Sequence, residues 1–303
     1  MKRLTQECFQ RARSFVEKVG REVDRRMLAF DLGEGSADDV VDALSAYQNS
    51  DGGFGRALEG DLRADVSSVI TTTVAFQYLR RVGAPSDNAT VRRGIQYLLD
   101  TYDEGSGVWP IIPPEVCNAP HAPWWNYDGI EERFEGFKLN PAAEALGYLL
   151  DYPNDVPATL LTVLTETVLA RIDSKQDKLD MFDLACSIRL AETASLPENA
   201  RATLIPRIEA AADNVVDRNP EKWSSFSAKP VSLAESPESL LAPTLDADIQ
   251  RNLDYEIDHQ GADGAWIPYW TWEGDAWQQA ERDWKGHLTV NMLRTLRAFD
   301  RIG

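Results

Sequence analysis

Cysteine and histidine are scarce in this chain of 303 residues, which contains three of each. The cysteines are Cys8, Cys117 and Cys186. Because they are odd in number and widely spaced, the sequence shows neither a disulfide framework nor a Cys-x-x-Cys metal site. Three isolated histidines also argue against a zinc site. We therefore predict no bound metal and no cofactor.

Basic residues and long apolar runs are also few. The 31 lysines and arginines are outnumbered by 49 acidic residues, which gives a formal net charge of −18. A protein of that charge repels nucleic-acid phosphates, so we predict no nucleic-acid partner. No stretch approaches the ~20 apolar residues of a membrane span, and the polar start at residues 1–20 lacks the apolar run of a secretion signal. We predict a cytoplasmic protein without a membrane span.

Strand-like alternation is scarce, whereas helical periodicity recurs along the chain. Residues 38–47 carry apolar side chains at three- and four-residue spacing, and residues 66–79 are nearly apolar around the helix circumference. Further helices are predicted at 90–102, 141–152, 157–172, 179–193, 197–216, 245–259 and 288–299. Amphipathic and more apolar helices roughly alternate, which indicates an outer ring of helices around an inner ring. No linker is evident, so we predict one all-α domain spanning residues 1–303.

The most informative motif is a turn that occurs twice. It reads Gln-Asn-Ser-Asp-Gly-Gly-Phe at 48–54 and Gln-Gly-Ala-Asp-Gly-Ala-Trp at 260–266. Each copy lies between helical stretches, and weaker copies lie at 102–109 and 221–223. Such recurrence indicates an internally repeated helical array. The aromatic residues predicted to occupy equivalent corners are Phe54, Trp109, Trp223 and Trp266.

These Gln-x-x-Asp-Gly-x-aromatic turns resemble the QW-type repeats of squalene and terpene cyclases and of protein prenyltransferase β-subunits. The resemblance implies an α/α toroid built from helical-hairpin repeats, with a central cavity for a mostly apolar, isoprenoid-type ligand. The segments 57–63 and 119–125 look like those of small bacterial or archaeal proteins described as prenyltransferase-like. The resemblance covers most of the chain through its repeat pattern.

Two motifs of the resembled enzymes are missing. The Asp-x-Asp-Asp motif, which protonates an alkene in some cyclases, has no counterpart, because Asp246-Ala247-Asp248-Ile249 lacks the last acid. The Asp-x-Cys pair of zinc-dependent prenyltransferases is also absent, since Asp183 and Cys186 are three residues apart. We therefore expect a ligand-binding protein of this type without the standard acid motif or zinc site.

Two loops carry polar and aromatic side chains suited to a ligand site, and each follows a repeat corner and precedes an apolar helix. The predicted catalytic side chains in these loops are Glu59, Asp61 and His121. The predicted ligand-binding side chains are Arg63, Trp124, Trp125 and Asp128. A histidine can act as an acid or base near neutral pH. We predict that both loops face the same cavity mouth.

A third group of candidates lies near the C-terminal end, where tryptophans cluster. The predicted ligand-binding side chains there are Trp270, Trp272, Trp284 and His287. Such rings stabilise cations, stack on sugars or fill a core, and the sequence leaves these three roles open. On presumed inner helices, Glu144 and Asp180 are further catalytic candidates, because a buried charge is costly unless it is paired or functional.

Two other functions remain open beside isoprenoid binding. A glycan-active enzyme would need a Trp-lined cleft and two carboxylates, which Glu59 or Asp61 with Glu144 or Asp180 would supply. A non-catalytic toroid scaffold would instead use its concave face for a protein partner. The sequence does not decide the oligomeric state.

Overall fold

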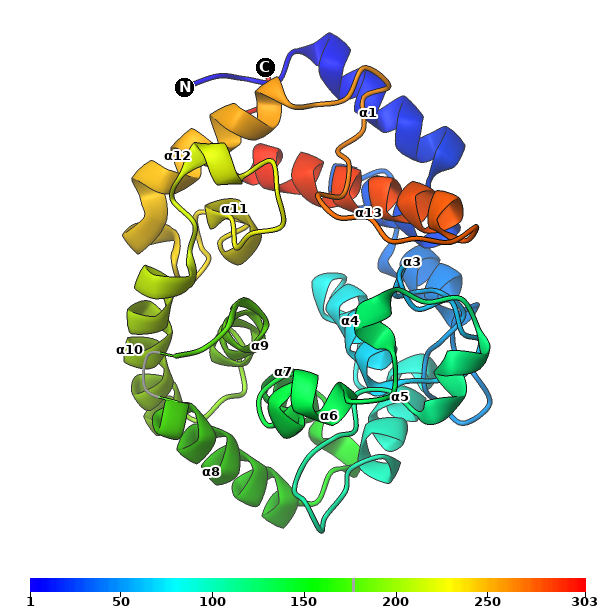
Figure 1. The fold of residues 1–303 in the computed structure, drawn as a ribbon, viewed down its shortest axis with the longest axis vertical. Coiled ribbons are helices and arrows are strands. Elements are labelled where there is room, and N and C mark those ends of the chain that lie inside the picture. Colours follow the sequence, from blue (N-terminus) through cyan, green and yellow to red (C-terminus); the bar gives the residue numbers. More distant parts are fainter. Residues whose placement is uncertain (176–177) are drawn as a thin grey trace. The chain divides into compact units, whose positions relative to one another are not determined.

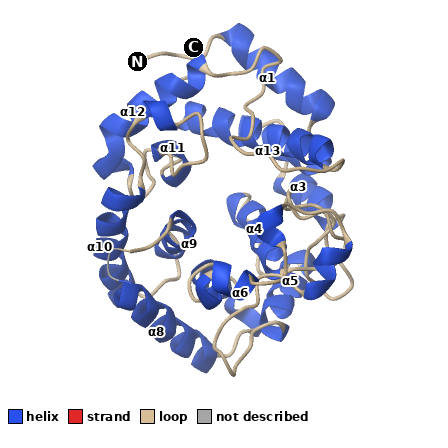
Figure 2. Ribbon diagram, in the orientation of Figure 1, coloured by secondary structure: helices blue, strands red, loops and turns tan. Residues whose placement is uncertain are grey.

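The chain is built from helices joined by loops, as Figure 2 shows. The computed structural model describes residues 1–175 and 178–303, and within these ranges the only β-structure is a set of isolated bridges in the loops. The predicted all-α class is confirmed. The chain divides into two compact units: unit 1 is Met1–Ala43 with Val216–Gly303, and unit 2 is Leu44–Val215. The toroid arrangement and the single domain of residues 1–303 stay predictions.

Unit 2 contains two layers of helices (Figure 1). The first layer consists of α4 (Val69–Arg81), α7 (Ala142–Asp151) and α9 (Met181–Ala191). The second consists of α5 (Ala89–Asp100), α8 (Ala158–Lys175) and α10 (Glu198–Val215), and it covers one side of the first. Shorter pieces are α6 (Ile130–Arg133), η1 (Pro114–Asn118), η2 (Pro123–Trp125), η3 (Glu135–Phe137) and η4 (Pro153–Asp155).

Helix α7 is the centre of unit 2. Every residue from Ala142 to Leu150 is buried, because α4 and α9 flank the helix while α5 and α8 cover it. Burial on all sides explains why its sequence is almost entirely apolar. The exception is Glu144, a buried charged residue in the first turn of this apolar helix.

Unit 1 gathers both ends of the chain. It contains α1 (Gln6–Val19), α2 (Glu22–Leu32), the start of α3 (Ala37–Ser45), η5 (Pro220–Lys222), α11 (Pro230–Leu233), α12 (Ala242–Asp258) and α13 (Trp277–Ala298). Helix α13 packs on α1 and α2, and α11 packs on α12. The termini are joined by backbone hydrogen bonds, with Leu4 N 2.7 Å from Arg301 O and Gly303 N 2.9 Å from Leu4 O. None of the described helices combines the length and apolar content needed to cross a bilayer.

The last helix differs from its predicted bounds. It begins at Trp277 rather than at Leu288. Charged side chains are frequent in its first half, which obscures the apolar periodicity there. The longer helix includes both Trp284 and His287.

The first of the two repeated turns is held by its glutamine. Gln48 Nε2 donates to Gly52 O across the turn at 2.9 Å and to Thr90 O in the first turn of α5, also at 2.9 Å. The backbone N–H of Phe54 donates to Thr72 Oγ1 inside α4 at 3.0 Å. The turn thus ties two helices that follow it in the chain.

The second turn makes the corresponding bonds. Gln260 Nε2 donates to Gly264 O at 2.9 Å and to Cys8 O in the first turn of α1 at 3.0 Å. The backbone N–H of Trp266 donates to Thr289 Oγ1 inside α13 at 3.1 Å. A glutamine, a turn and a threonine therefore form the same network in both units.

The glycines of the two turns explain why this motif is so restricted. Gly52 and Gly264 have φ angles of 90° and 92°. A Cβ added to Gly52 would lie 2.3 Å from Arg93 O, and one added to Gly264 would lie 2.4 Å from the carbonyl carbon of Arg11. Only glycine allows both the backbone conformation and this approach to the neighbouring helix.

The three corner tryptophans also share a local role. Each is buried, and each indole N–H donates to a backbone carbonyl at or just beyond the end of the preceding long helix. Trp109 donates to a carbonyl of α5, Trp266 to one of α12, and Trp223 to Asp217 just after α10. Carbonyls at helix ends lack intrahelical partners, so the indoles satisfy them.

Candidate functional site

A buried polar cluster joins the three helices of the first layer of unit 2. Its centre is the carboxylate of Glu144 on α7. Oε1 accepts from Gln77 Nε2 on α4 at 2.8 Å and from the Tyr148 hydroxyl at 2.5 Å. Oε2 accepts from Arg189 Nη1 on α9 at 3.2 Å and from Cys186 Sγ at 3.6 Å. Donors from three helices thus stabilise one carboxylate away from water.

The Glu144 charge shapes the ionisation of its neighbours. Burial raises the pKa of the Cys186 thiol and of the Tyr148 hydroxyl, and Glu144 raises both further. Burial lowers the pKa of Arg189, but Glu144 and other neighbours more than compensate, so the pKa of Arg189 lies above its ordinary value. Cys186 and Tyr148 are therefore neutral donors, and Arg189 is a permanent cation.

Arg189 is attached to this cluster through one nitrogen. Its side chain is 37% exposed, and Nε and Nη2 have no protein acceptor among the described residues. Ala185 and Phe182 lie on the same face of α9, and Phe182 is 45% exposed. Helix α4 presents Val74 and Ile70, both half-buried. A cation and accessible apolar side chains thus share one face of this layer.

Unit 1 contains a second group, which we call the aromatic series: Phe226, Trp270, Trp284 and His287. Successive ring centroids are 5.8, 5.0 and 5.6 Å apart, and the rings meet edge to face. Trp284 and His287 lie one turn apart on α13, while the other two rings come from loops. Asn291 Nδ2 donates to His287 Nε2 at 2.9 Å. The structure therefore brings together three of the four predicted C-terminal ligand-binding residues.

Two properties of the aromatic series favour contact with a ligand. Phe226 is 53% exposed. Trp284 Nε1 is buried, and no acceptor for its N–H lies in the part of the chain that the structure describes. The fourth predicted residue, Trp272, is buried, and its ring centroid lies 5.7 Å from that of Trp277.

A buried ion pair in unit 1 lies outside every predicted site. Lys229 Nζ is 3.0 Å from Glu256 Oε1 and 2.9 Å from the centroid of the Tyr269 ring, and the Tyr269 hydroxyl donates to Glu256 Oε2 at 2.9 Å. Burial lowers the pKa of Lys229 to about 8, while Glu256 acts in the opposite direction. One signal for this pair was present in the sequence. Glu256 follows Ile249 and Leu253 at helical spacing, and all three are buried on α12.

The two loops predicted to share a site in unit 2 lie side by side. Leu62 and His121 form an antiparallel bridge. Arg63 N donates to Pro120 O at 3.1 Å, and the Asp61 carbonyl accepts from the backbone of the second loop at 2.8 Å. The two segments are therefore neighbours, and the prediction that they face one cavity mouth and form a ligand site stays a prediction.

Within these loops, Glu59 and Asp61 are buried, and His121 is held locally. His121 Nδ1 lies 2.7 Å from Ala119 O, and Nε2 lies 2.9 Å from Asn126 Oδ1. Both contacts come from the loop that carries the histidine. The imidazole therefore helps to fix the loop conformation.

The remaining predicted residues have varied settings. Trp125 is buried and stacks on Phe134 at 5.4 Å, whereas Trp124 is half-buried and Asp128 is exposed. Asp180 caps α9, because Oδ1 accepts from the backbone N–H groups of the second and third residues after it, each at 2.8 Å. Such capping is a structural role.

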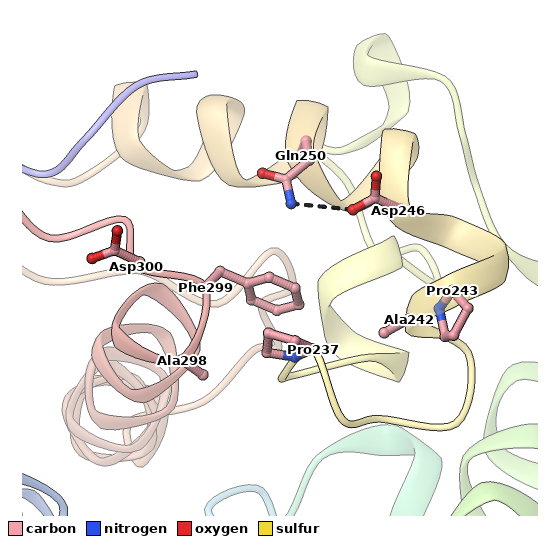
Figure 3. Close-up of a pocket in the computed structure, with 8 residues that line it drawn as sticks. All are labelled: Pro237, Ala242, Pro243, Asp246, Gln250, Ala298, Phe299 and Asp300. Carbon is pink, nitrogen blue, oxygen red and sulfur yellow. Dashed lines mark hydrogen bonds between the residues drawn. The ribbon is translucent and has the colours of Figure 1, made fainter.

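A groove of about 450 Å³ lies in unit 1 beside α12 and the end of α13. Figure 3 shows the Phe299 ring pointing toward Pro237, with Asp246 and Gln250 one turn apart on the opposite wall. None of the predicted site residues lines it. Within residues 1–175 and 178–303, no group of three or more His, Cys, Asp or Glu side chains is placed to hold a metal ion.

Comparison of the chain with protein-family models finds no match, and comparisons with curated proteins and with solved structures find none either. The function therefore has to follow from the geometry of these clusters.

Proposed function

We propose that this protein binds a mostly apolar, isoprenoid-type ligand against the aromatic series of unit 1. The observation that carries the proposal is the chain of edge-to-face contacts through Trp270, Trp284 and His287, which ends at the half-exposed Phe226. Aromatic rings contribute large apolar contact areas at a low entropy cost. The buried N–H of Trp284 suits a ligand with a single oxygen acceptor, such as a prenyl alcohol.

The proposal includes an α/α toroid of the terpene cyclase and prenyltransferase type. It is supported by the matching networks of Gln48 and Gln260, each of which ties a turn to the first turn of another helix. It is supported as well by the layered packing within unit 2. In such a toroid, the aromatic series would line the central cavity.

Binding, rather than acid–base catalysis, is the activity that these positions favour. Glu144 is occupied by donors from three helices, and Asp180 is occupied by its helix cap. A general base must be able to reach a substrate proton. Either carboxylate would have to give up hydrogen bonds of the folded protein before it could act on a substrate.

The test uses farnesol, an isoprenoid alcohol, and maltoheptaose, a glycan, with the purified full chain. We expect farnesol to raise the melting temperature and to change the tryptophan fluorescence in a saturable way. Trp284→Phe keeps a ring but removes the N–H, so it should weaken farnesol binding. The matched control is Trp277→Phe, which changes a tryptophan of the same helix outside the aromatic series and should bind farnesol like the parent.

The outcomes separate the three functions considered above. Farnesol binding that Trp284→Phe weakens supports the proposal. Stabilisation by maltoheptaose alone would favour a glycan ligand. No response to either compound, or equal farnesol binding by both variants, would contradict the proposal.

A further inference from the structure

We propose that the accessible face of the first layer of unit 2 is an oxyanion site, at which Arg189 receives the carboxylate of an amphipathic small molecule. None of its residues belongs to the aromatic series, and its ligand is an anion, so it goes beyond the proposed function. The argument rests on how Arg189 is held, on which of its donors remain available and on what surrounds it.

Arg189 is held in a way that orients it. Its Nη1 is bonded to Glu144, and that carboxylate is itself fixed by Gln77 and Tyr148 from two helices. Arg80 supports the same region, since its Nη1 donates to Arg189 O at 3.0 Å and its guanidinium lies 4.5 Å from the Tyr148 ring centroid. A guanidinium anchored at one nitrogen loses little further freedom when it binds a ligand.

The remaining donors of Arg189 suit a carboxylate. The Nε and Nη2 atoms form the side of the guanidinium that binds two oxygens at once, and neither has a protein acceptor among the described residues. The side chain is accessible, at 37% exposed. The net charge of −18 repels anions from the protein as a whole, so anion binding on this face would depend on the local donors of Arg189.

The surroundings of Arg189 indicate that the ligand also has an apolar part. Ala185 and Phe182 continue along the same face of α9, and Val74 and Ile70 lie on the accessible face of α4. Arg189 follows Phe182 by seven positions, so this apolar strip is about 10 Å long, which matches an extended tail of about eight carbons. Octanoate is therefore a suitable probe.

The experiment measures binding to the full chain by calorimetry, with sodium octanoate, octanol and inorganic phosphate as probes. We expect octanoate to bind at least about tenfold more tightly than octanol or phosphate, because only octanoate supplies both a carboxylate and a tail. Arg189→Gln should lose at least about tenfold in octanoate affinity, and Arg189→Lys should lose less, because it keeps the charge but not the planar fork. The control is Arg207→Gln, which removes a half-exposed, ion-paired arginine of α10 and should bind octanoate like the parent.

A second measurement needs no variant and so does not depend on folding of Arg189→Gln. Phenylglyoxal modifies accessible guanidinium groups, and mass spectrometry reports the extent at each arginine. Octanoate should protect Arg189 and leave Arg207 unprotected.

Equal octanoate binding by Arg189→Gln and the parent, or no protection of Arg189, would overturn the proposal. Equal binding of phosphate and octanoate would overturn the apolar part. Loss of farnesol binding in Trp284→Phe bears only on the aromatic series, so the two proposals can fail separately.

Discussion

Removing one partner of the buried Lys229–Glu256 pair should cost far more stability than removing both. The two side chains are 7% and 1% exposed. Lys229→Met leaves the Glu256 carboxylate buried with the Tyr269 hydroxyl at 2.9 Å and the more distant Asn252 amide at 3.5 Å. A buried charge that loses its partner costs about 3 to 5 kcal/mol, and the retained tyrosine hydrogen bond places this variant near 3 kcal/mol.

The double variant Lys229→Met/Glu256→Gln should recover most of that loss. It removes both charges, and the new amide oxygen still accepts from the Tyr269 hydroxyl. We expect its free energy of unfolding to lie within about 1 kcal/mol of the parent, because replacing a whole buried ion pair by neutral groups is often close to neutral. The coupling energy of the double-mutant cycle should then be at least about 2 kcal/mol.

Urea unfolding at pH 7, followed by tryptophan fluorescence, measures all four proteins of the cycle. The control is Lys2→Met, which breaks the half-exposed pair between Lys2 and Asp258 and should change the free energy of unfolding by less than about 1 kcal/mol. A Lys229→Met variant as stable as the parent would refute the reasoning. So would a double variant whose loss equals the sum of the two single losses, since the pair would then contribute no coupling.

The same pair predicts a pH dependence with a definite sign. Burial lowers the pKa of Lys229 from 10.5 to about 8. The unfolded chain thus binds this proton up to a higher pH than the folded chain, and the contribution of Lys229 to stability becomes more favourable as pH rises from about 8 toward 10.5. Between pH 8 and 10, the stability of the parent should gain about 2 kcal/mol relative to Lys229→Met. No gain, or a change of opposite sign, would contradict the lowered pKa.

Three further predictions concern the repeated turns and the metal. Gly52→Ala should lower the free energy of unfolding by at least about 2 kcal/mol more than Gly33→Ala, because both have positive φ but only the first would push a Cβ onto backbone atoms; equal losses in urea unfolding would contradict this. Thr72→Val and Thr289→Val should each cost about 1 to 3 kcal/mol, because each leaves a buried backbone N–H of a corner aromatic residue without its acceptor; a large loss at one site alone would show that the turns are not equivalent. Chelation followed by elemental analysis should find no stoichiometric zinc and an unchanged melting temperature, whereas retained zinc would revive the prenyltransferase chemistry.

Local features of the sequence were sufficient for the helical class and for the repeated turn. Positive φ and close backbone approach admit only glycine, so the positions of Gly52 and Gly264 carry the turn geometry directly. The glutamine side chain that closes each turn also bonds within the motif, at Gly52 and Gly264. Such short-range interactions leave a pattern in the chain that can be read without coordinates.

Long-range partners could not be read in this way. Two of the donors that hold Glu144, Gln77 on α4 and Arg189 on α9, are 67 and 45 residues away, and Lys229 meets Glu256 across 27 residues. Which charged side chain pairs with which depends on how helices pack, because helical spacing fixes only the face that a residue occupies. The sequence by itself therefore determined an all-helical chain with two equivalent turns, and it also marked Glu144 as a buried charge that required a partner. Only the tertiary structure decided that this carboxylate orients Arg189, because that contact exists solely where three separate helices meet.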